Sequence, residues 1–172
     1  IKAFPELYFA KFVVLGEGDS EEIVIPKIAE AMGIHLDRSF VAMVPLGGRH
    51  VNHFWRLLND LNIPHATLLD LDWGRKGGGW GRITNSIKLL RKFHNKNREF
   101  FPHAPSEWFQ LIVKHEVFPE DVIEEISKKT NADFTEWLNT FENYSVFYTN
   151  PLDLDYSMFK AFPEYYKQAI PE

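Results

Sequence analysis

Short apolar runs alternate along this chain with segments whose apolar positions repeat at helical spacing. Four runs have the length and the Val, Leu and Phe content of buried strands, at residues 11–15, 40–46, 65–72 and 145–149. Helical spacing lies between them, most clearly over 19–33 and 51–61. Because parallel neighbours need crossover connections, this alternation predicts an α/β fold in which a parallel sheet of about four strands is flanked by helices.

Helix-capping and helix-breaking residues indicate where the predicted helices begin and end. Gly16 closes the first apolar run, and Asp19 is the predicted N-cap, with Glu22 three residues later as its capping-box partner. This helix should stop near Gly33, and Pro26 removes one backbone donor from its interior, which predicts a kink.

The second half of the chain is less regular. The Gly-rich segment WGRKGGGWGR leads into a predicted helix over roughly 83–97, in which Ile83, Ile87, Leu90 and Phe93 share one face. Two short helices are expected within 120–141, on either side of Asn131. We interpret 1–172 as one domain with a helical insertion at roughly 100–142.

Composition narrows the class of protein. The 172 residues are 45% hydrophobic and 15% aromatic, which is enough for a sizeable core, and they include no Cys, which excludes disulfides and thiol chemistry. The sequence has neither a membrane-length apolar run nor a signal peptide, so we expect a cytoplasmic protein with no membrane partner. The chain does not begin with Met, and we expect it to be part of a longer polypeptide.

Charge is unevenly distributed along the chain. The net charge is −5, which argues against a general nucleic-acid binder, yet residues 73–98 hold eight Lys and Arg and no Asp or Glu. This basic segment begins directly after an acidic pair. Its first cations, Arg75, Lys76 and Arg82, are candidate contacts to a DNA backbone.

Pairs of acids follow three of the four predicted strands. The pairs are Glu17 and Glu21, Asp70 and Asp72, and Asp153 and Asp155. Because the carboxyl ends of parallel strands lie along one edge, where open α/β sheets place their sites, six carboxylates are expected to meet there. Such crowding is costly unless cations neutralise it. Oxygen ligands without Cys favour Mg²⁺ or Mn²⁺ as the metal.

Each acidic pair also has an ordinary structural explanation. Acids in a first helical turn are favoured by the helix macrodipole, and both Asp-x-Asp pairs could serve in turns. For a single pair these explanations are as good as a metal site, but the coincidence of three pairs at one edge favours the site. Two carboxylate-held metals can activate water for in-line displacement at a phosphodiester.

Two segments, GEGDSEE and LLDLDWGRKGGGW, resemble the Toprim domain, in which a strand-terminal Glu precedes a strand-terminal Asp-x-Asp. Within that superfamily the chain is similar to the overcoming-lysogenization-defect (OLD) nucleases from roughly residue 12 to 166, which also includes PLDLDYSMFKAFPEYY. The resemblance implies a two-metal DNA endonuclease or nickase domain, joined to an upstream ABC-type ATPase domain that lies outside this chain. It further implies anti-phage defence and a homodimer or higher oligomer of the full-length protein.

The resemblance also implies roles for individual residues. Glu17, Asp70 and Asp72 match the family's catalytic acids, and the metal set adds Glu21, Asp153 and Asp155. The family uses a basic residue downstream of its last acidic motif, which we expect beyond Glu172. No nucleotide site is expected in this domain, because Gly77–Gly79 lack the Lys-Ser/Thr ending of a P-loop.

Other functions remain open from the sequence. The chain could be a non-catalytic module that binds DNA or a partner, with metals that only order its acidic edge. It could also be a phosphotransfer receiver or phosphatase, although the Glu-first pattern and the adjacent basic loop disfavour that. A DNA-joining Toprim enzyme is a third alternative, but no context for a catalytic Tyr supports it.

Overall fold

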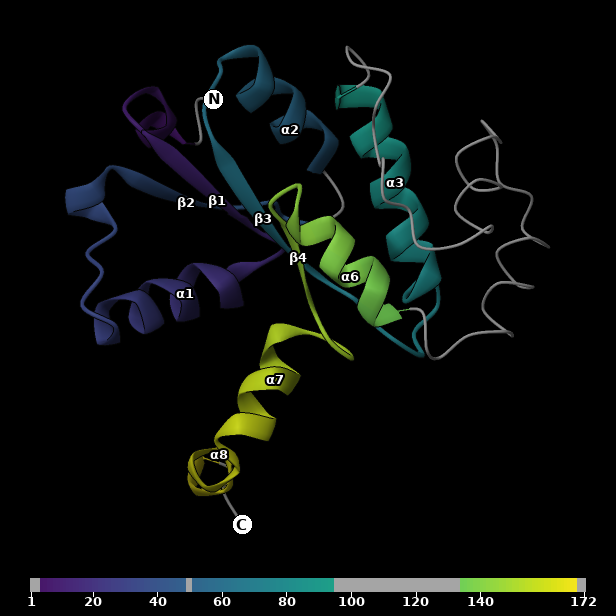
Figure 1. Ribbon diagram of the computed structural model, residues 1–172. Coiled ribbons are helices and arrows are strands. Elements are labelled where there is room, and N and C mark those ends of the chain that lie inside the picture. The colour runs from purple at the N-terminus through teal and green to yellow at the C-terminus, as the bar shows by residue number, and fades with distance from the viewer. Residues whose placement is uncertain (1–3, 49–50, 95–133, 170–172) are drawn as a thin grey trace.

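The computed structural model describes residues 4–48, 51–94 and 134–169 (Figure 1). Its strands are β1 (Phe12–Gly16), β2 (Val41–Pro45), β3 (His65–Asp70) and β4 (Val146–Thr149). Its α-helices are α1 (Asp19–Ala31), α2 (Val51–Asp60), α3 (Trp80–His94), α6 (Phe134–Glu142), α7 (Leu154–Ala161) and α8 (Pro163–Ala169). Two 3-10 turns, η1 (Pro5–Tyr8) and η2 (Asp37–Ser39), flank β1 and β2.

The strands form one sheet in the order β2-β1-β3-β4, and every neighbouring pair is parallel. This confirms the predicted α/β fold with a parallel sheet of four strands flanked by helices. All four strands end at the same edge. The segments after β1, β3 and β4, which carry the predicted acids, therefore begin side by side.

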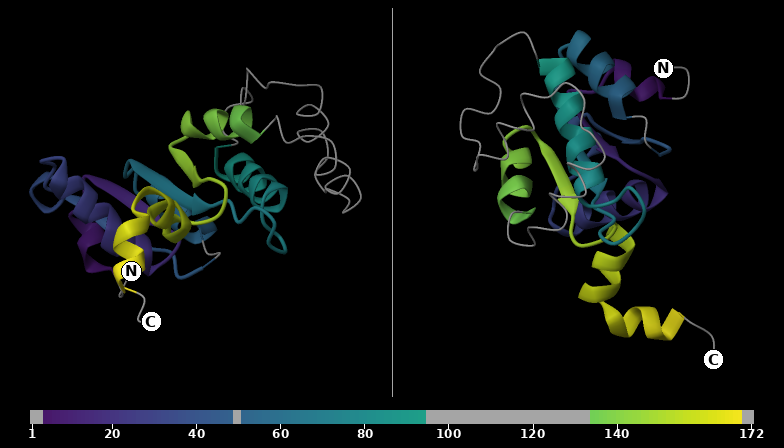
Figure 2. Two further views of the ribbon diagram at one scale, coloured as in Figure 1. Left: turned by 90° about the horizontal axis from the view of Figure 1, so that it is seen from below. Right: turned by 90° about the vertical axis from the view of Figure 1, so that its right-hand side faces the viewer.

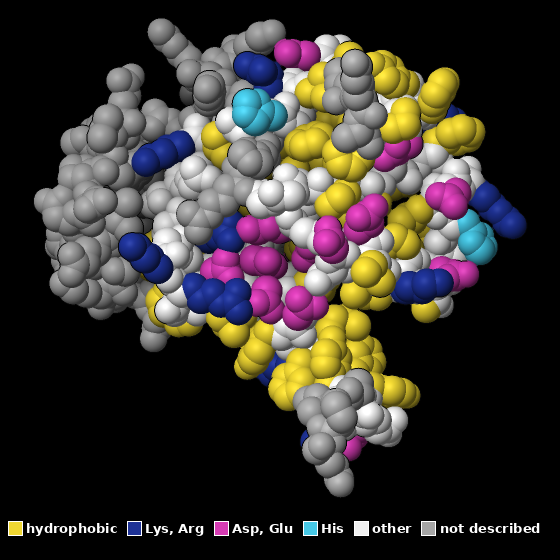
Figure 3. All heavy atoms as spheres, turned by 180° about the vertical axis from the view of Figure 1, so that it is seen from behind, with side chains coloured by type: hydrophobic (Ala, Val, Ile, Leu, Met, Phe, Trp, Pro, Cys, Tyr) yellow, Lys and Arg dark blue, Asp and Glu magenta, His cyan; other side chains and the backbone are white. Residues whose placement is uncertain are grey.

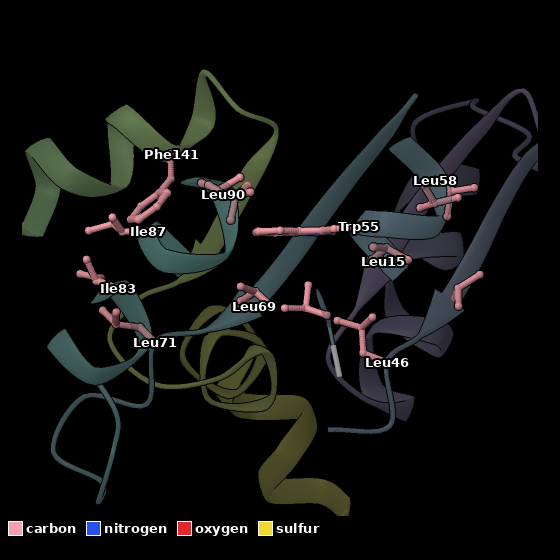
Figure 4. Close-up of a cluster of buried hydrophobic side chains, with 14 of the residues drawn as sticks. Leu15, Leu46, Trp55, Leu58, Leu69, Leu71, Ile83, Ile87, Leu90 and Phe141 are labelled. Atoms are coloured by element: carbon pink, nitrogen blue, oxygen red, sulfur yellow. The ribbon is translucent and has the colours of Figure 1, made fainter. Parts of the chain in front are cut away.

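A continuous hydrophobic core lies between the sheet and the helices α2 and α3 (Figure 4). Leu15 of β1, Leu58 of α2 and Ile87 of α3 are fully buried in it. Trp55 lies at its centre, and its indole N–H donates to Thr67 Oγ1 at 2.8 Å, so a polar group of β3 is satisfied inside the core. Of the predicted helical face, Ile83, Ile87 and Leu90 are buried as expected, and the side chain of Phe93 lies outside the described residues.

The C-terminal elements extend from the β4 edge. α6 packs on β4 through aromatic residues, with the Phe141 and Tyr148 rings 5.5 Å apart. α7 and α8 project away from the sheet at its carboxyl edge (Figures 1 and 2), and α7 contacts α1. The described helices include none that is long and apolar enough to cross a membrane.

The structure corrects some predicted boundaries. The N-cap of α1 is Gly18 and not Asp19, and the capping carboxylate is Glu21 and not Glu22, because the helix begins one residue earlier than predicted. β3 ends at Asp70, so Asp72 belongs to the following loop.

The other differences concern the second half of the chain. α3 begins at Trp80, three residues before its predicted start. Of the predicted insertion at 100–142, only α6 is described, and the expected helix before Asn131 lies outside the described residues.

Candidate metal centre

Glu17 joins the ends of two neighbouring strands. It follows β1 directly, and its Oε2 accepts a hydrogen bond from the backbone N–H of Asp70, the last residue of β3, at 3.0 Å. Its Oε1 lies 2.7 Å from Nη2 of Arg82. Both carboxylate oxygens of Glu17 therefore have a defined partner, and its side chain is held against β3.

Glu21 is buried beneath the turn between β1 and α1, with 3% of its surface exposed. Its Oε2 accepts from the backbone N–H of Gly18 at 2.7 Å, which caps the helix. Burial raises the pKa of Glu21, and the neighbouring charges of Glu17 and Asp155 act in the same direction, while backbone hydrogen bonds oppose them. Gly16 makes room for this side chain, because a Cβ there would overlap Glu21 Cβ.

Asp70 is the acid with the most unfavourable environment. Burial raises the pKa of Asp70 to about 7, against a partial lowering by the hydroxyl of Thr149, which donates to Oδ1 at 3.0 Å. The charges of Glu17, Glu21 and Asp72 raise it further. Among the described residues no ion pair reaches Asp70. Its negative charge therefore lacks a counter-ion within residues 4–48, 51–94 and 134–169.

Asp72 lies in a tight turn and is neutralised by two arginines. Its backbone is left-handed (φ 52°), and the 73–79 loop folds back so closely that a Cβ at Gly78 would overlap the Asp72 carbonyl oxygen. Arg75 Nη1 lies 2.6 Å from Oδ1, and Arg82 Nη2 contacts Oδ2. Burial would raise the pKa of Asp72, but the hydrogen bonds from Arg82 and Arg75 outweigh it and hold that pKa below its usual range.

Asp153 and Asp155 enter the cluster from the start of α7. The chain after β4 pairs with the segment after β3, because Asp72 N donates to the carbonyl of Leu152 at 2.9 Å. Asp153 then caps α7 by accepting from Tyr156 N at 2.8 Å, and its other oxygen lies 2.8 Å from Arg75 Nη2. Asp155 lies farther out, where both its oxygens accept from Ser20 Oγ at 3.0 and 3.1 Å.

All six predicted acids therefore gather at the carboxyl edge of the sheet, where Asp and Glu side chains form one patch bordered by cations (Figure 3). The cations were predicted to face DNA. Instead, Arg75 and Arg82 contact the acids in this structure, while Lys76 is exposed on the loop between them. Their role as DNA contacts stays a prediction.

Sequence reasoning did not identify three features of this cluster: the ion-pairing role of Arg82, the hydroxyl of Thr149 and the hydroxyl of Ser20. Thr149 ends β4 beside Asp70, so a polar residue at a buried strand end was the available signal. The partner of Ser20 is 135 residues away, and no local pattern indicates it.

The chemistry of the donor set fits hard divalent cations. Carboxylates crowd together at a partly buried edge, and the pKa values of Asp70 and Glu21 are raised, as expected where positive charge is insufficient. In the described side-chain arrangement no three Asp, Glu or His side chains form a ready metal-ligand group. Arg75 and Arg82 hold carboxylate oxygens that a cation would need, so these contacts would have to rearrange.

Comparison with known proteins finds a family model that matches the first part of this chain. Residues 8–72, which carry the first four of these acids, match the family described as overcoming lysogenization defect protein-like, TOPRIM domain. This part of the chain matches an OLD-like TOPRIM domain. The match covers the segments that form β1, α1, β2, α2 and β3. It therefore includes both the Glu after β1 and the Asp-x-Asp at the end of β3.

Solved structures share the fold of this chain. The C-terminal region of the Xanthomonas campestris pv. campestris OLD protein superposes with a TM-score of 0.60 at 23% identity, covering 95% of this chain and 61% of that one. The C-terminal region of the Burkholderia pseudomallei OLD protein gives a TM-score of 0.60 at 21% identity, with 95% and 68% covered.

A curated relative, endonuclease GajA of Bacillus cereus (strain VD045), is 25% identical over 174 residues. The alignment covers 97% of this chain but 28% of that protein, so the chain spans about a quarter of its relative's length.

Proposed function

We propose that this OLD-like TOPRIM domain is the catalytic part of a DNA endonuclease or nickase that requires Mg²⁺ or Mn²⁺. One observation carries the proposal: three separate segments bring six carboxylates to one sheet edge, and Asp70 there has no counter-ion among the described residues. The relation to endonuclease GajA supports the choice of a phosphodiester as the substrate.

The proposal assigns the residues as follows. Glu17, Asp70 and Asp72 would hold the metals closest to the reacting phosphate, and Glu21, Asp153 and Asp155 would complete the metal set. Bound there, two divalent ions would activate water and stabilise the leaving oxygen.

The chain's own groups would prepare this site. The backbone N–H of Asp70 and the hydroxyl of Thr149 orient Glu17 and Asp70, as partners of metal ligands commonly do. The exposed cations of the 73–79 loop stand beside the acids, where a phosphodiester backbone could be held next to them. The proposal extends to the whole protein. It would bind DNA, carry an upstream ATPase domain, form an oligomer and act in anti-phage defence.

The test is nicking of supercoiled plasmid DNA in Mn²⁺. Asp70→Asn and Glu17→Ala should each lower the rate more than about 100-fold, because each removes a proposed metal ligand. Asp60→Asn is the matched control, since Asp60 is an exposed acid at the end of α2, on the opposite edge of the sheet. Wild-type rates in the two site variants would refute the assignment.

The same measurement separates the main alternative, a non-catalytic module with a metal-ordered edge. That alternative predicts thermal stabilisation by Mn²⁺ with no nicking, even when the domain is tested within the longer protein.

A further inference from the structure

Two arginines of one short segment hold three of the six acids. Arg75 lies in the 73–79 loop and Arg82 in the first turn of α3, and between them they contact carboxylates that follow β1, β3 and β4. Every oxygen of Glu17, Asp72 and Asp153 then has a partner, from a guanidinium or a backbone N–H. A cation that binds these acids has to take over oxygens held by a guanidinium.

The two arginines differ in how firmly they are held. Arg82 has 15% of its side chain exposed, and its Nε is buried without a hydrogen-bond partner among the described residues, so this guanidinium is enclosed by the fold. Arg75 has 56% of its side chain exposed and lies on a loop whose glycines Gly74 and Gly77 have positive φ. Arg75 is therefore the arginine that can leave the acids without repacking α3.

Arg75 is also well placed for a second partner. It bridges Asp72 and Asp153 at the rim of the cluster, next to the exposed Lys76. A guanidinium binds carboxylate and phosphate oxygens with the same planar geometry. If cations neutralise the two acids, the nearest anion of the right kind for Arg75 is a phosphate of the DNA backbone.

We propose that Arg75 is an exchangeable counter-ion: it bridges Asp72 and Asp153 when metal is absent, and it turns to a backbone phosphate when metal occupies those acids. This inference rests on the proposed function. It makes metal binding and DNA binding mutually dependent, because a metal ion releases the side chain that grips DNA.

The first experiment measures Mn²⁺ affinity by calorimetry on metal-free protein. Arg75→Gln should bind Mn²⁺ about two- to fivefold more tightly than Lys76→Gln, because it removes a competitor for the acids, whereas the Lys76 variant removes the same charge from the same loop without breaking an ion pair of the cluster. Equal affinities in the two variants would overturn the inference.

The second experiment measures binding of a short DNA duplex by fluorescence anisotropy, with and without Ca²⁺ as a cation that supports binding. Wild type should gain affinity when Ca²⁺ is added, and Arg75→Gln should lose most of that gain. Lys76→Gln should weaken binding by a similar factor in both conditions. If Arg75→Gln gains as much DNA affinity on addition of Ca²⁺ as wild type does, the exchange is contradicted.

The two proposals fail in different ways. Mn²⁺ binding that is unaffected by Arg75→Gln, together with metal-dependent nicking, refutes the exchange and leaves the nuclease. Absence of Mn²⁺ binding in every variant refutes the nuclease and the exchange together.

Discussion

Asp70 has the least favourable electrostatic environment of the six acids. It is partly buried, three other acids surround it, and a single hydroxyl is its described side-chain partner. Asp72, two residues away, is held by two guanidiniums, and its pKa is lowered where that of Asp70 is raised. The pKa values of the two acids in one Asp-x-Asp pair thus shift in opposite directions, because burial acts on Asp70 while the arginines contact only Asp72.

The pKa of about 7 for Asp70 makes the stability of the metal-free protein depend on pH. The folded state holds its proton more tightly than the unfolded chain does, so the free energy of unfolding falls as pH rises from about 4 to about 7. Asp70→Asn should remove this fall. The free energy of unfolding of the variant, relative to that of wild type, should therefore rise by on the order of 2 kcal/mol between these pH values, after allowance for solvent screening.

Urea unfolding in EDTA at pH 5 and pH 8 measures this difference. Asp60→Asn serves as the control, and its stability relative to wild type should be the same at both pH values. A pH-independent gap between Asp70→Asn and wild type would show that the pKa of Asp70 is not raised.

At the residue scale, the sequence predicted which acids meet but not what holds them. Strand ends of a parallel sheet share an edge, so Glu17, Asp70 and Asp153 could be placed near one another from periodicity alone. The partners of the acids depend on the path of the 73–79 loop and on contacts across many residues. Arg82 is one of eight cations in residues 73–98, and the sequence around it gives no local sign that its side chain is turned inward.

At the scale of elements, the 73–79 loop controls the position of Asp72. Gly78 N donates to the carbonyl of Arg75 and Gly79 N to that of Leu71, which brings the loop back over the end of β3. The Gly run was predicted as a loop. The structure shows why position 78 requires glycine, because a Cβ there would overlap the backbone of Asp72. Periodicity cannot show such a close approach, because it depends on the return path of the chain.

Gly78→Ala should therefore destabilise the protein by about 1–3 kcal/mol and weaken Mn²⁺ binding, since the new Cβ displaces the Asp72 backbone. Gly81→Ala is the matched variant in α3, where a Cβ meets nothing within 4 Å. It should raise stability by about 0.5–1 kcal/mol, because Ala is the better helix former.

Both variants are measured by urea unfolding and Mn²⁺ titration. If Gly78→Ala binds Mn²⁺ as wild type does, the loop does not set the position of Asp72.

At the scale of the whole molecule, one core under the sheet supports the edge that carries the acids. The order β2-β1-β3-β4 places the two acid-bearing central strands, β1 and β3, next to each other. The sequence predicted the fold class and the four strands, but it could not give this order. Strand order depends on long-range pairing, whereas the apolar pattern records only which residues are buried.

Leu58→Ala should lower the free energy of unfolding by about 2–5 kcal/mol, because Leu58 is fully buried in the core between α2 and the sheet. Ile23→Ala, at a position of α1 with 67% exposure, should change it by less than about 0.5 kcal/mol. Urea unfolding followed by Trp fluorescence and by circular dichroism checks both values. Coincident transitions in the two signals are expected, and a Leu58 variant as stable as Ile23→Ala would contradict the assigned core.

The spacing of the contacts around Asp72 has a consequence for the order in which the cluster assembles as the chain is synthesised. Arg75 and Arg82 are 3 and 10 residues from Asp72, whereas the contact between Glu17 and Asp70 spans 53 residues and that between Ser20 and Asp155 spans 135. Short loops close more readily than long ones, so Asp72 obtains its counter-ions from its own segment before the last acids have been made. When β4 and α7 are added, the Arg75 guanidinium is already in position to pair with Asp153. The repulsion between Asp153 and the acids already present is therefore smaller when β4 joins the sheet.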